Sequence, residues 1–181
     1  MSSLKQNINN LPNTFIEIKE YHLLPSAFPL TSTPYLETES RDYSAMWFQL
    51  DGKSIVFRQA KITPNKQGQF VTLWKRPAPD SEIMPFEKSD KIDFCLIATF
   101  SEHQKGMFLF DSHILIKQGV FSSQTKAGKR AIRVYPTWVF PTSKQALQTK
   151  KWQSPYFINF DKQKTAIEKF KNIFLNYNHK I

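Results

Sequence analysis

The sequence predicts an α/β fold of the α+β kind, in which a mixed central β-sheet is flanked by helices. Three observations lead to this prediction. The dipeptide Asp51-Gly52, a strong signal for a two-residue hairpin turn, joins two segments rich in strand-forming residues. Further apolar segments of strand length follow as far as Tyr135. The helical patterns gather late in the chain, and the last of them has a regular apolar stripe.

The hairpin begins the predicted sheet, with one strand at 43–50 and the next at 54–61. A third strand at 69–76 alternates larger apolar and smaller or polar residues, and it follows a turn-like stretch that contains proline and glycine. Together these segments predict a three-strand antiparallel meander. Pro77 and Pro79 end it, because proline cannot donate a hydrogen bond to a strand ladder.

The remaining elements are predicted from apolar runs, turn residues and helix caps. In chain order they are a short helix within 15–24, strands at 92–100 and 107–110, a helix from an N-cap at Asp111 or Ser112 to Lys117, a strand at 131–135, a helix from an N-cap at Ser143 to Lys150, and a last helix with Asp161 as its N-cap. No repeat, low-complexity tract or linker interrupts the chain. We therefore expect one domain over 1–181, with an N-terminal helical or extended segment (1–42), a core sheet (43–160) and a C-terminal helix (161–181).

Composition excludes several classes of protein. Hydrophobic residues at 40% and charged residues at 22% are typical of a globular chain rather than a disordered one. No stretch has the ~18 consecutive apolar residues of a membrane helix, and residues 1–10 have no signal-peptide pattern, so we expect a cytoplasmic protein without membrane insertion. Cys95, the single cysteine, predicts a buried thiol, and the four histidines lack zinc-site spacing; we expect no metal and no cofactor.

The formal net charge of +10 is unevenly distributed. No acidic residue occurs between Asp51 and Asp80, or between Asp111 and Asp161, although both segments contain many lysines and arginines. Either these segments form a positive surface that faces a polyanion such as DNA or RNA, or other parts of the fold bring acids beside them. The first interpretation predicts nucleic-acid contacts at Arg58, Lys61, Lys66, Lys75, Arg76, Lys126, Lys129, Arg130, Arg133, Lys150, Lys151 and Trp152.

Two features within this set admit alternatives. Gly128, in the basic stretch 126–130, permits close backbone approach to a phosphate, but the stretch is equally consistent with a solvated loop and lacks the glycine pattern of a nucleotide-binding loop. Trp152 follows two lysines, so it either stacks on an unpaired base or packs in the core.

The end of the hairpin carries a candidate catalytic constellation. A two-residue loop makes Leu50 face Lys53, and the same register brings Asp42 opposite Lys61, with Gln59 on the same face. Metal-dependent nucleases use such a carboxylate and lysine, but they also place a second carboxylate where this chain has Gln59. The site is therefore a weak nuclease, a cleft that binds without cutting, or only an exposed ion pair.

Two long phrases resemble one protein family. They are Phe57-Arg58-Gln59-Ala60-Lys61-Ile62-Thr63-Pro64, followed by the segment 68–76, and Gly128-Lys129-Arg130-Ala131-Ile132-Arg133-Val134-Tyr135-Pro136. Both are similar to the MepB family, and the resemblance extends from about Tyr43 to Phe157. It implies a restriction-endonuclease-like fold without a complete nuclease site, and an accessory role beside a multidrug efflux pump.

Taken together, the charge pattern and the resemblance predict a non-catalytic nucleic-acid-binding protein with little sequence specificity. The alternative from another class is an accessory protein that binds a small ligand or a protein partner in a cleft lined by some of its 16 phenylalanines and 4 tryptophans. Weak metal-dependent nuclease activity is the third hypothesis. Salt dependence of binding separates the first from the second, because only phosphate contacts release counterions.

Overall fold

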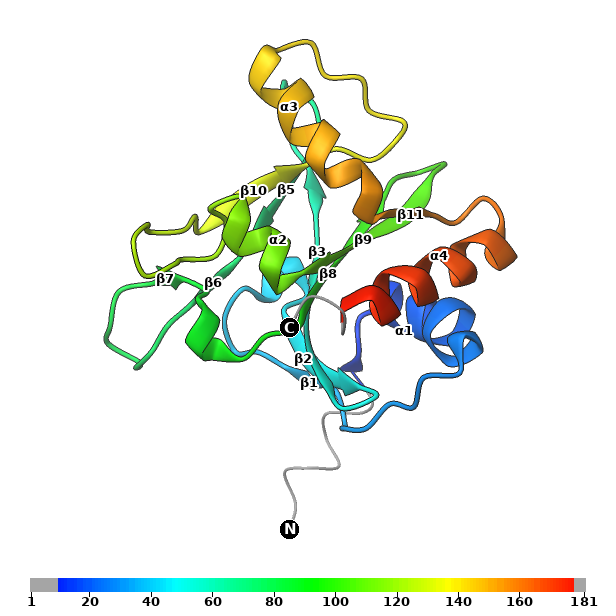
Figure 1. Ribbon diagram of the computed structural model, residues 1–181, viewed down its shortest axis with the longest axis horizontal. Coiled ribbons are helices and arrows are strands. Elements are labelled where there is room, and N and C mark those ends of the chain that lie inside the picture. Colours follow the sequence, from blue (N-terminus) through cyan, green and yellow to red (C-terminus); the bar gives the residue numbers. More distant parts are fainter. Residues whose placement is uncertain (1–9, 178–181) are drawn as a thin grey trace.

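Six strands form the central sheet of the computed structural model, which describes residues 10–177 (Figure 1). They are β1 (Tyr35–Leu36), β2 (Met46–Leu50), β3 (Lys53–Gln59), β8 (Phe94–Phe100), β9 (Lys105–Asp111) and β11 (Phe157–Asn159). They lie in the order β1-β2-β3-β8-β9-β11. All neighbours are antiparallel except β3 and β8, so the sheet is mixed, as the sequence predicts.

The predicted hairpin is confirmed in its turn and its register. Leu50 pairs with Lys53, and the ladder runs back to the pair Met46–Phe57. Asp51 and Gly52 both have positive φ, at 48° and 71°, as a tight two-residue hairpin turn requires. A local turn signal therefore determines the register of this strand pair.

The third strand of the predicted meander is wrong in its pairing. The segment forms β5 (Gln69–Thr72), which lies in a separate three-stranded sheet between β10 (Ala131–Val134) and β4 (Lys61–Ile62). β8 takes the place beside β3 instead. The physical reason lies in the two sequences, because β8 is apolar on both faces and suits a central strand, whereas β5 alternates and suits a sheet with one solvent face. A two-stranded sheet of β6 (Trp74–Lys75) and β7 (Met84–Pro85) follows.

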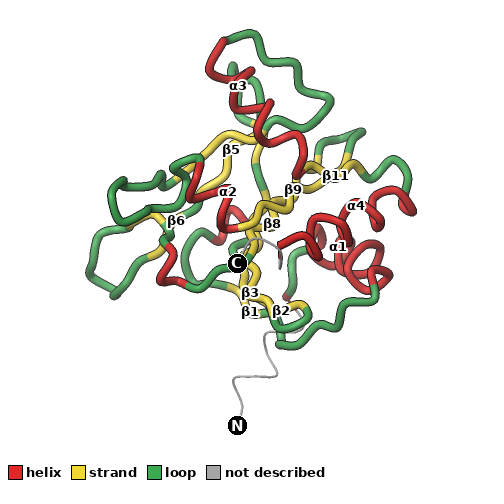
Figure 2. The backbone as a smooth tube through the Cα atoms, in the orientation of Figure 1, coloured by secondary structure: helices red, strands yellow, loops and turns green. Residues whose placement is uncertain are grey.

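Helices and the second sheet cover the two faces of the central sheet (Figures 1 and 2). α1 (Asn13–Ile18) and α4 (Gln163–Asn176) pack on one face through a cluster that includes Phe15 and Phe170. α2 (Ser112–Lys117) and the inner side of β5 and β10 pack on the other face, with Val71 and Ile132 in a second cluster. Successive residues of β8 alternate between the two clusters, so the central sheet separates two cores.

Most predicted helices are confirmed, with changes at their ends. Asp111 caps α2 and Ser143 caps α3 (Lys144–Gln153), each by accepting a hydrogen bond from a backbone N–H of the first turn. Asp161 is not the N-cap of the last helix. Lys162 takes that position, because its carbonyl accepts the first helical hydrogen bond, from the Ala166 N–H, and α4 begins at Gln163.

The N-terminal helix is longer than α1 alone. It continues as a π-helical turn at Lys19–Leu23 and a 3₁₀ turn at Leu24–Ser26. Residues 1–9 of the predicted N-terminal segment and 178–181 of the predicted C-terminal helix lie outside the described residues.

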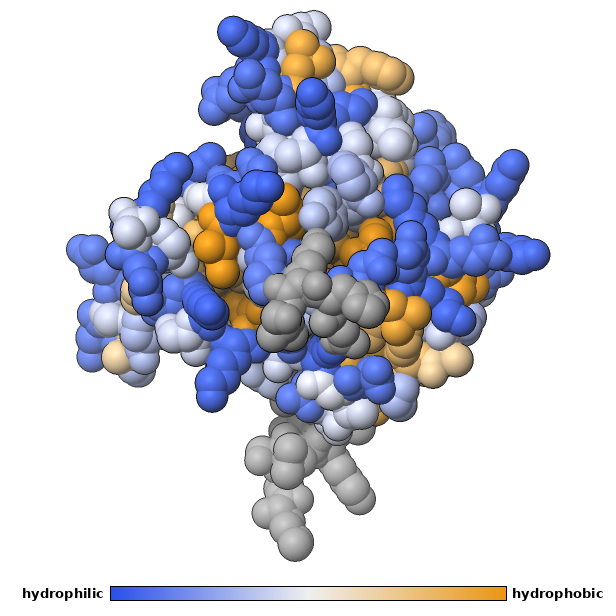
Figure 3. All heavy atoms as spheres, viewed as in Figure 1, coloured by the Kyte–Doolittle hydropathy of each residue, from blue (hydrophilic) through white to orange (hydrophobic). Residues whose placement is uncertain are grey.

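The predicted apolar stripe of the last helix is core, with Ala166, Phe170 and Phe174 buried. Cys95 is buried as expected, and burial raises the pKa of its thiol to about 12. None of the helices within 10–177 has the length and apolar character needed to cross a membrane. Hydrophilic side chains cover most of the side that carries β6 and β7, whereas hydrophilic and apolar groups lie side by side over α3 (Figure 3).

Candidate nucleic-acid interface

The outer side of the three-stranded sheet brings bases and aromatic rings together. Phe70 in β5 pairs directly with Lys61 in β4 and with Arg133 in β10. Directly opposed residues in a sheet project to the same face, so all three side chains lie on one side. Val71 and Ile132 project to the opposite side, into the core. The sheet thus has one apolar inner face and one basic outer face.

Contacts join these side chains into a row. The Lys61 ammonium lies 4.8 Å from the centroid of the Tyr43 ring, and Tyr43 meets Phe70 edge-on at 6.1 Å between centroids. The Arg133 guanidinium lies 5.7 Å from the Phe70 centroid. These separations are in the range of cation–π contacts. We call Tyr43, Lys61, Phe70 and Arg133 the aromatic–basic face.

Arg133 is held in place by the loop that follows β4. Its Nη2 donates to the Thr63 hydroxyl at 2.7 Å, and its Nη1 donates to the carbonyls of Gln67 and Gly68 at 3.4 and 3.3 Å. Gly68 has φ of 76°, and a Cβ there would come within 2.9 Å of the Val134 carbonyl. The loop can therefore fold this closely onto β10 only with glycine at this position.

The same loop joins the aromatic–basic face to the protruding helix at the top of Figure 1. We call the loop 136–143 together with α3 the α3 lobe. The Gln67 amide donates to the Phe140 carbonyl at 2.9 Å and accepts from the Thr142 N–H at 3.0 Å. Phe140 is 76% exposed, and the Lys150 ammonium lies 4.8 Å from its ring centroid. Arg133 and the Phe140 backbone therefore both contact Gln67, so the loop after β4 connects the aromatic–basic face to the lobe that carries the Phe140 ring.

The α3 lobe is fixed to the sheet by a buried amide. Gln153 is fully buried, accepts from the Tyr135 N–H and donates to the Arg133 carbonyl, both at 2.9 Å. The Gln153 side chain thereby forms hydrogen bonds with the backbone at the free edge of β10, as a neighbouring strand would. Trp152 packs against Phe110 at 5.3 Å between ring centroids, within the second core cluster. Its core role is thus the alternative that the structure supports.

The basic stretch before β10 is a loop packed on its own chain. A Cβ at Gly128 would come within 2.4 Å of the Val120 carbonyl and 2.6 Å of the Ser122 nitrogen. Glycine at this position therefore lets the loop pack closely on residues 120–122. This packing, and not the close approach of a phosphate that the sequence suggests, accounts for the glycine. The predicted contacts that remain exposed are Lys61, Lys66, Lys126, Lys129, Arg130 and Lys151.

Three predicted nucleic-acid contacts are occupied by acids from elsewhere in the chain. Arg58 is fully buried and pairs with Glu37 at 2.9 Å. Lys75 binds Glu87 and Asp90 at 2.7 and 2.6 Å. A separate contact joins Arg76 Nε to Glu39 at 2.6 Å, and Arg76 also binds the Ser81 carbonyl. Arg58 cannot reach a phosphate from the core, so we exclude it from the interface. For Lys75 and Arg76, the second interpretation of the charge pattern holds.

The strand register on which the predicted nuclease-like constellation rests does not extend to Asp42. The β2–β3 ladder ends at Met46, and Asp42 lies on a 3₁₀ turn bounded by Ser40 and Ser44, which both have positive φ. Lys61 pairs with Phe70 in the other sheet, so it is not the ladder partner of Asp42.

The side chain of Gln59 is bound to the N-terminal helix and to the turn before β2. Its amide oxygen accepts from the hydroxyls of Thr14 in α1, at 2.9 Å, and Ser44, at 3.5 Å. Across residues 10–177, no three His, Cys, Asp or Glu side chains gather as a metal ion would need.

Tyr43, Phe70 and Phe140 are interface candidates that the sequence analysis missed. A signal for Phe70 exists, because it alternates with Val71 and so projects to the face opposite the core. Phe140 stands next to Pro141 in a loop, where an apolar residue has no regular element to bury it. Tyr43 has no such signal, since its position depends on where the hairpin ends.

A family model described as MepB-like matches residues 37–159. A crystal structure of MepB is similar to this chain, with a TM-score of 0.71 and 32% sequence identity over 83% of this chain and 99% of that one. No curated protein matches the sequence significantly. The matched segment contains all residues of the aromatic–basic face and the α3 lobe.

Proposed function

The chain belongs to the MepB-like family, and we propose that it binds nucleic acid along the aromatic–basic face and the α3 lobe, without cleaving it and with little sequence preference. One observation carries the proposal. Three exposed or half-buried rings, Tyr43, Phe70 and Phe140, alternate with the bases Lys61, Arg133 and Lys150 along one connected surface.

Charge supports this surface as a site for a polyanion. Within the described part of the chain, neither Lys61 nor Arg133 lies within 4.0 Å of a carboxylate, and the same is true of Lys150. Lys129 and Ala131 line one hollow with Arg133, so the exposed loop before β10 adds its charge nearby. Bases without local acids keep their potential available to phosphates.

The rings favour single strands over duplex. A base can stack on an exposed ring only when its own neighbours do not cover it, and stacking of this kind is tolerant of sequence. Phe140, at 76% exposure, is the most available ring. The proposed substrate is therefore single-stranded DNA or RNA, read mainly through its backbone and the faces of its bases.

Support for binding without cleavage comes from the hairpin end. A metal-dependent nuclease needs carboxylates on the strands that flank the phosphate. Here Gln59 is bound to Thr14 and Ser44, and Asp42 lies on a turn outside the ladder. The restriction-endonuclease-like ancestry, the cytoplasmic location and the accessory role in drug efflux that the family resemblance implies stay predictions.

The experiment compares Phe140→Ala with Tyr21→Ala in binding to an unpaired oligonucleotide, by fluorescence anisotropy. Tyr21 is 58% exposed and lies beside α1, away from the proposed surface. Loss of one stacking partner should weaken binding about fivefold to a hundredfold for Phe140→Ala, and Tyr21→Ala should bind as the unaltered protein does.

Salt dependence provides the second readout of the same experiment. The unaltered protein should lose affinity steeply as salt rises, because phosphate contacts release counterions. Equal affinities for Phe140→Ala and the unaltered protein, or a flat salt dependence, would refute the proposed surface.

A further inference from the structure

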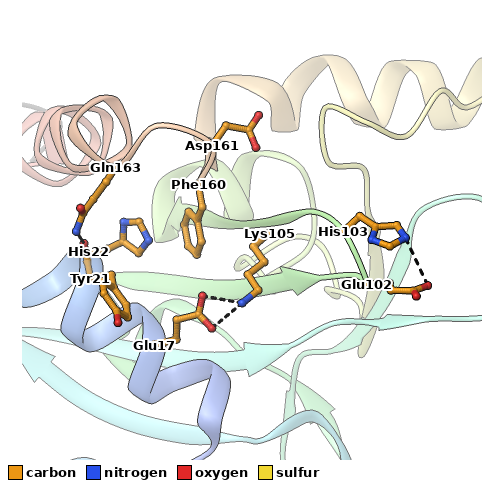
Figure 4. A pocket seen from close by; sticks show the side chains of 9 residues that line it. All are labelled: Glu17, Tyr21, His22, Glu102, His103, Lys105, Phe160, Asp161 and Gln163. Carbon is orange, nitrogen blue, oxygen red and sulfur yellow. Dashed lines mark hydrogen bonds and ion pairs between the residues drawn. The ribbon is translucent and has the colours of Figure 1, made fainter.

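A second site lies in the other layer of the molecule, beside α1. A cleft of about 410 Å³ opens between the helical turn at Lys19–Leu23, the turn that joins β8 to β9, and the start of α4 (Figure 4). We call it the His22 cleft. The central sheet separates it from the three-stranded sheet of the proposed nucleic-acid surface, so the two sites are independent.

His22 is the unusual residue of this cleft. It is only 3% exposed, and its Nδ1 is buried without a hydrogen-bond partner among the residues the structure describes. The imidazole points from its helix into the cleft and stacks on Phe160, with 3.8 Å between ring centroids (Figure 4). Buried polar groups without partners are rare and costly, so an unsatisfied imidazole in a cleft wall indicates a group that binds there.

The imidazole is neutral at physiological pH. Burial lowers the pKa of His22 to about 4, against an opposite and smaller effect of the Glu17 carboxylate. A neutral imidazole has one nitrogen that accepts a hydrogen bond and one that donates. In the tautomer with its proton on Nε2, the unpartnered Nδ1 of His22 is the acceptor that a ligand N–H can use.

The charge of the cleft is opposite to that of the protein. Its walls carry three carboxylates, from Glu17, Glu102 and Asp161, and one ammonium, from Lys105. Lys105 is engaged by Glu17, with 2.9 Å to each carboxylate oxygen. Glu102 and Asp161 are exposed, and among the described residues neither lies within 4.0 Å of a lysine or arginine side chain. A chain with net charge +10 thus has a locally negative cleft, which selects cations.

Aromatic rings give the cleft an apolar wall. Phe160 and the imidazole of His22 form a stacked pair, and the ring of Tyr21 lies at the rim with 58% of its surface exposed. Rings of this kind attract cations and bury flat ligands.

We propose that the His22 cleft binds a small organic cation that combines a flat ring with N–H donors. The ring packs on Tyr21 and Phe160, one N–H donates to His22, and the positive charge lies near Glu102 and Asp161. This ligand satisfies the unpaired imidazole and neutralises the two exposed carboxylates at once.

The probe for this proposal is benzamidinium, and its control is benzamide, which has nearly the same shape but no charge. Titration of the full chain is followed by the backbone amide resonances of Tyr21, His22 and Phe160. Benzamidinium should shift them saturably in the millimolar range, and benzamide should bind about tenfold more weakly, since hydrogen bonds and charge pairs to a cation contribute more than neutral ones. Equal affinity for the two compounds, or no saturable shift, overturns the proposal.

Three variants test whether the cation binds through the residues of the cleft or only through the overall electrostatic potential of the protein. His22→Phe keeps the stack on Phe160 and removes the nitrogens, so benzamidinium should bind about tenfold more weakly. Glu102→Gln and Asp161→Asn remove exposed charges and should each weaken binding severalfold. Glu20→Gln is the matched control, because Glu20 pairs with Lys19 outside the cleft, and it should have no effect.

The outcome for the control decides between local and general electrostatics. If Glu20→Gln weakens binding as much as Asp161→Asn, the cleft has no specific role and the proposal is wrong. The amide spectrum shows whether each variant folds, and the two exposed carboxylate variants carry the test if His22→Phe does not.

Discussion

The two acid-free segments of the chain differ in what the fold brings beside their bases. In the first, between Asp51 and Asp80, the bases Arg58, Lys75 and Arg76 all form ion pairs. In the second, between Asp111 and Asp161, none of the eight lysines and arginines lies within 4.0 Å of a carboxylate from residues 10–177. Similar sequence patterns thus differ in the fold. Three of the six bases of the first segment are paired with acids, although Lys61 and Lys66 stay exposed.

The acids that neutralise the first segment come from its immediate flanks. Glu37 and Glu39 precede it, and Glu87 and Asp90 follow it; all four fold back onto it. Asp111, which precedes the second segment, instead caps α2, because its side chain accepts a hydrogen bond from the Ile114 N–H. A run without acids therefore predicts a positive surface only where acids from outside the run do not fold back onto it.

The largest expected effect concerns the buried pair of the first segment. Glu37→Gln leaves the Arg58 guanidinium in the core without a counterion, and breaking such a pair costs about 3–5 kcal/mol of the free energy of unfolding. Urea denaturation measures this. Glu39→Gln is the matched control, because the pair of Glu39 and Arg76 is partly exposed and should cost less than about 1 kcal/mol. Similar losses for the two variants would mean that Arg58 is not desolvated as the structure shows.

A second prediction compares the two segments directly as partners of nucleic acid. Lys129→Ala/Arg130→Ala and Lys75→Ala/Arg76→Ala remove the same charge, one pair from each segment. The first double variant should lower the slope of log affinity against log salt by up to about 1.4 for single-stranded DNA, at about 0.7 per phosphate contact. The second should leave it almost unchanged, because its bases are already paired.

Anisotropy titrations at several salt concentrations provide these slopes. Equal losses of slope in the two double variants would show that nucleic acid displaces Glu39, Glu87 and Asp90 from their ion pairs. The distinction between the two segments would then fail.

Local signals explain what the sequence could predict of this fold. The turn at Asp51-Gly52 determines the hairpin register, and the caps Asp111 and Ser143 begin their helices, because each acts over a few residues. The partner of a strand depends on distant segments. The alternation of β5 indicates a strand with one solvent face, but nothing local indicates that β10 is its partner.

The same limit applies to the candidate site. The charge pattern predicts Lys61 and Arg133 as contacts, whereas their arrangement on either side of Phe70 depends on the β4–β5–β10 pairing. The same charge pattern includes Arg58. Its burial results from the pairing of β3 with β8, which local sequence does not reveal. The sign of a side-chain charge can be read from the sequence, but the exposure of that side chain depends on the tertiary structure.

A smaller effect is expected from the pH dependence of the Lys75 network. Burial lowers the pKa of Lys75, but its hydrogen bonds to Asp90 and Glu87 raise it more, so the pKa lies above the usual 10.5. The hydrogen bond from Lys75 holds the pKa of Glu87 below 4.5. The stabilisation from Lys75 is therefore present below pH 10.5 and lost as pH rises through the raised pKa, and that from Glu87 is lost as pH falls below 4.5.

Lys75→Met measures this contribution as a difference in Tm from the unaltered protein. The difference should be about 2–4 °C between pH 5 and 10 and should shrink towards pH 3 and pH 12. Lys129→Met is the matched control from the second segment, and its difference in Tm should be near zero at every pH. A Lys75→Met difference that does not vary with pH would mean that packing of the side chain, and not its charge, is responsible.

The smallest expected effect concerns the end of the hairpin in the first segment, at Gln59. On the predicted register, Gln59→Glu restores a second carboxylate beside Asp42 and raises affinity for magnesium. In the fold, Gln59 faces Thr14 of α1 and Ser44, and a glutamate there keeps the same two hydrogen-bond donors while Asp42 stays on its turn. We therefore expect no gain in Mg²⁺ or Mn²⁺ affinity by isothermal titration, no cleavage of DNA, and a change in unfolding free energy within about 0.5 kcal/mol. A clear gain in metal affinity that Asp42→Asn removes would show that the two carboxyl groups approach each other, and the nuclease hypothesis would regain its site within the first segment.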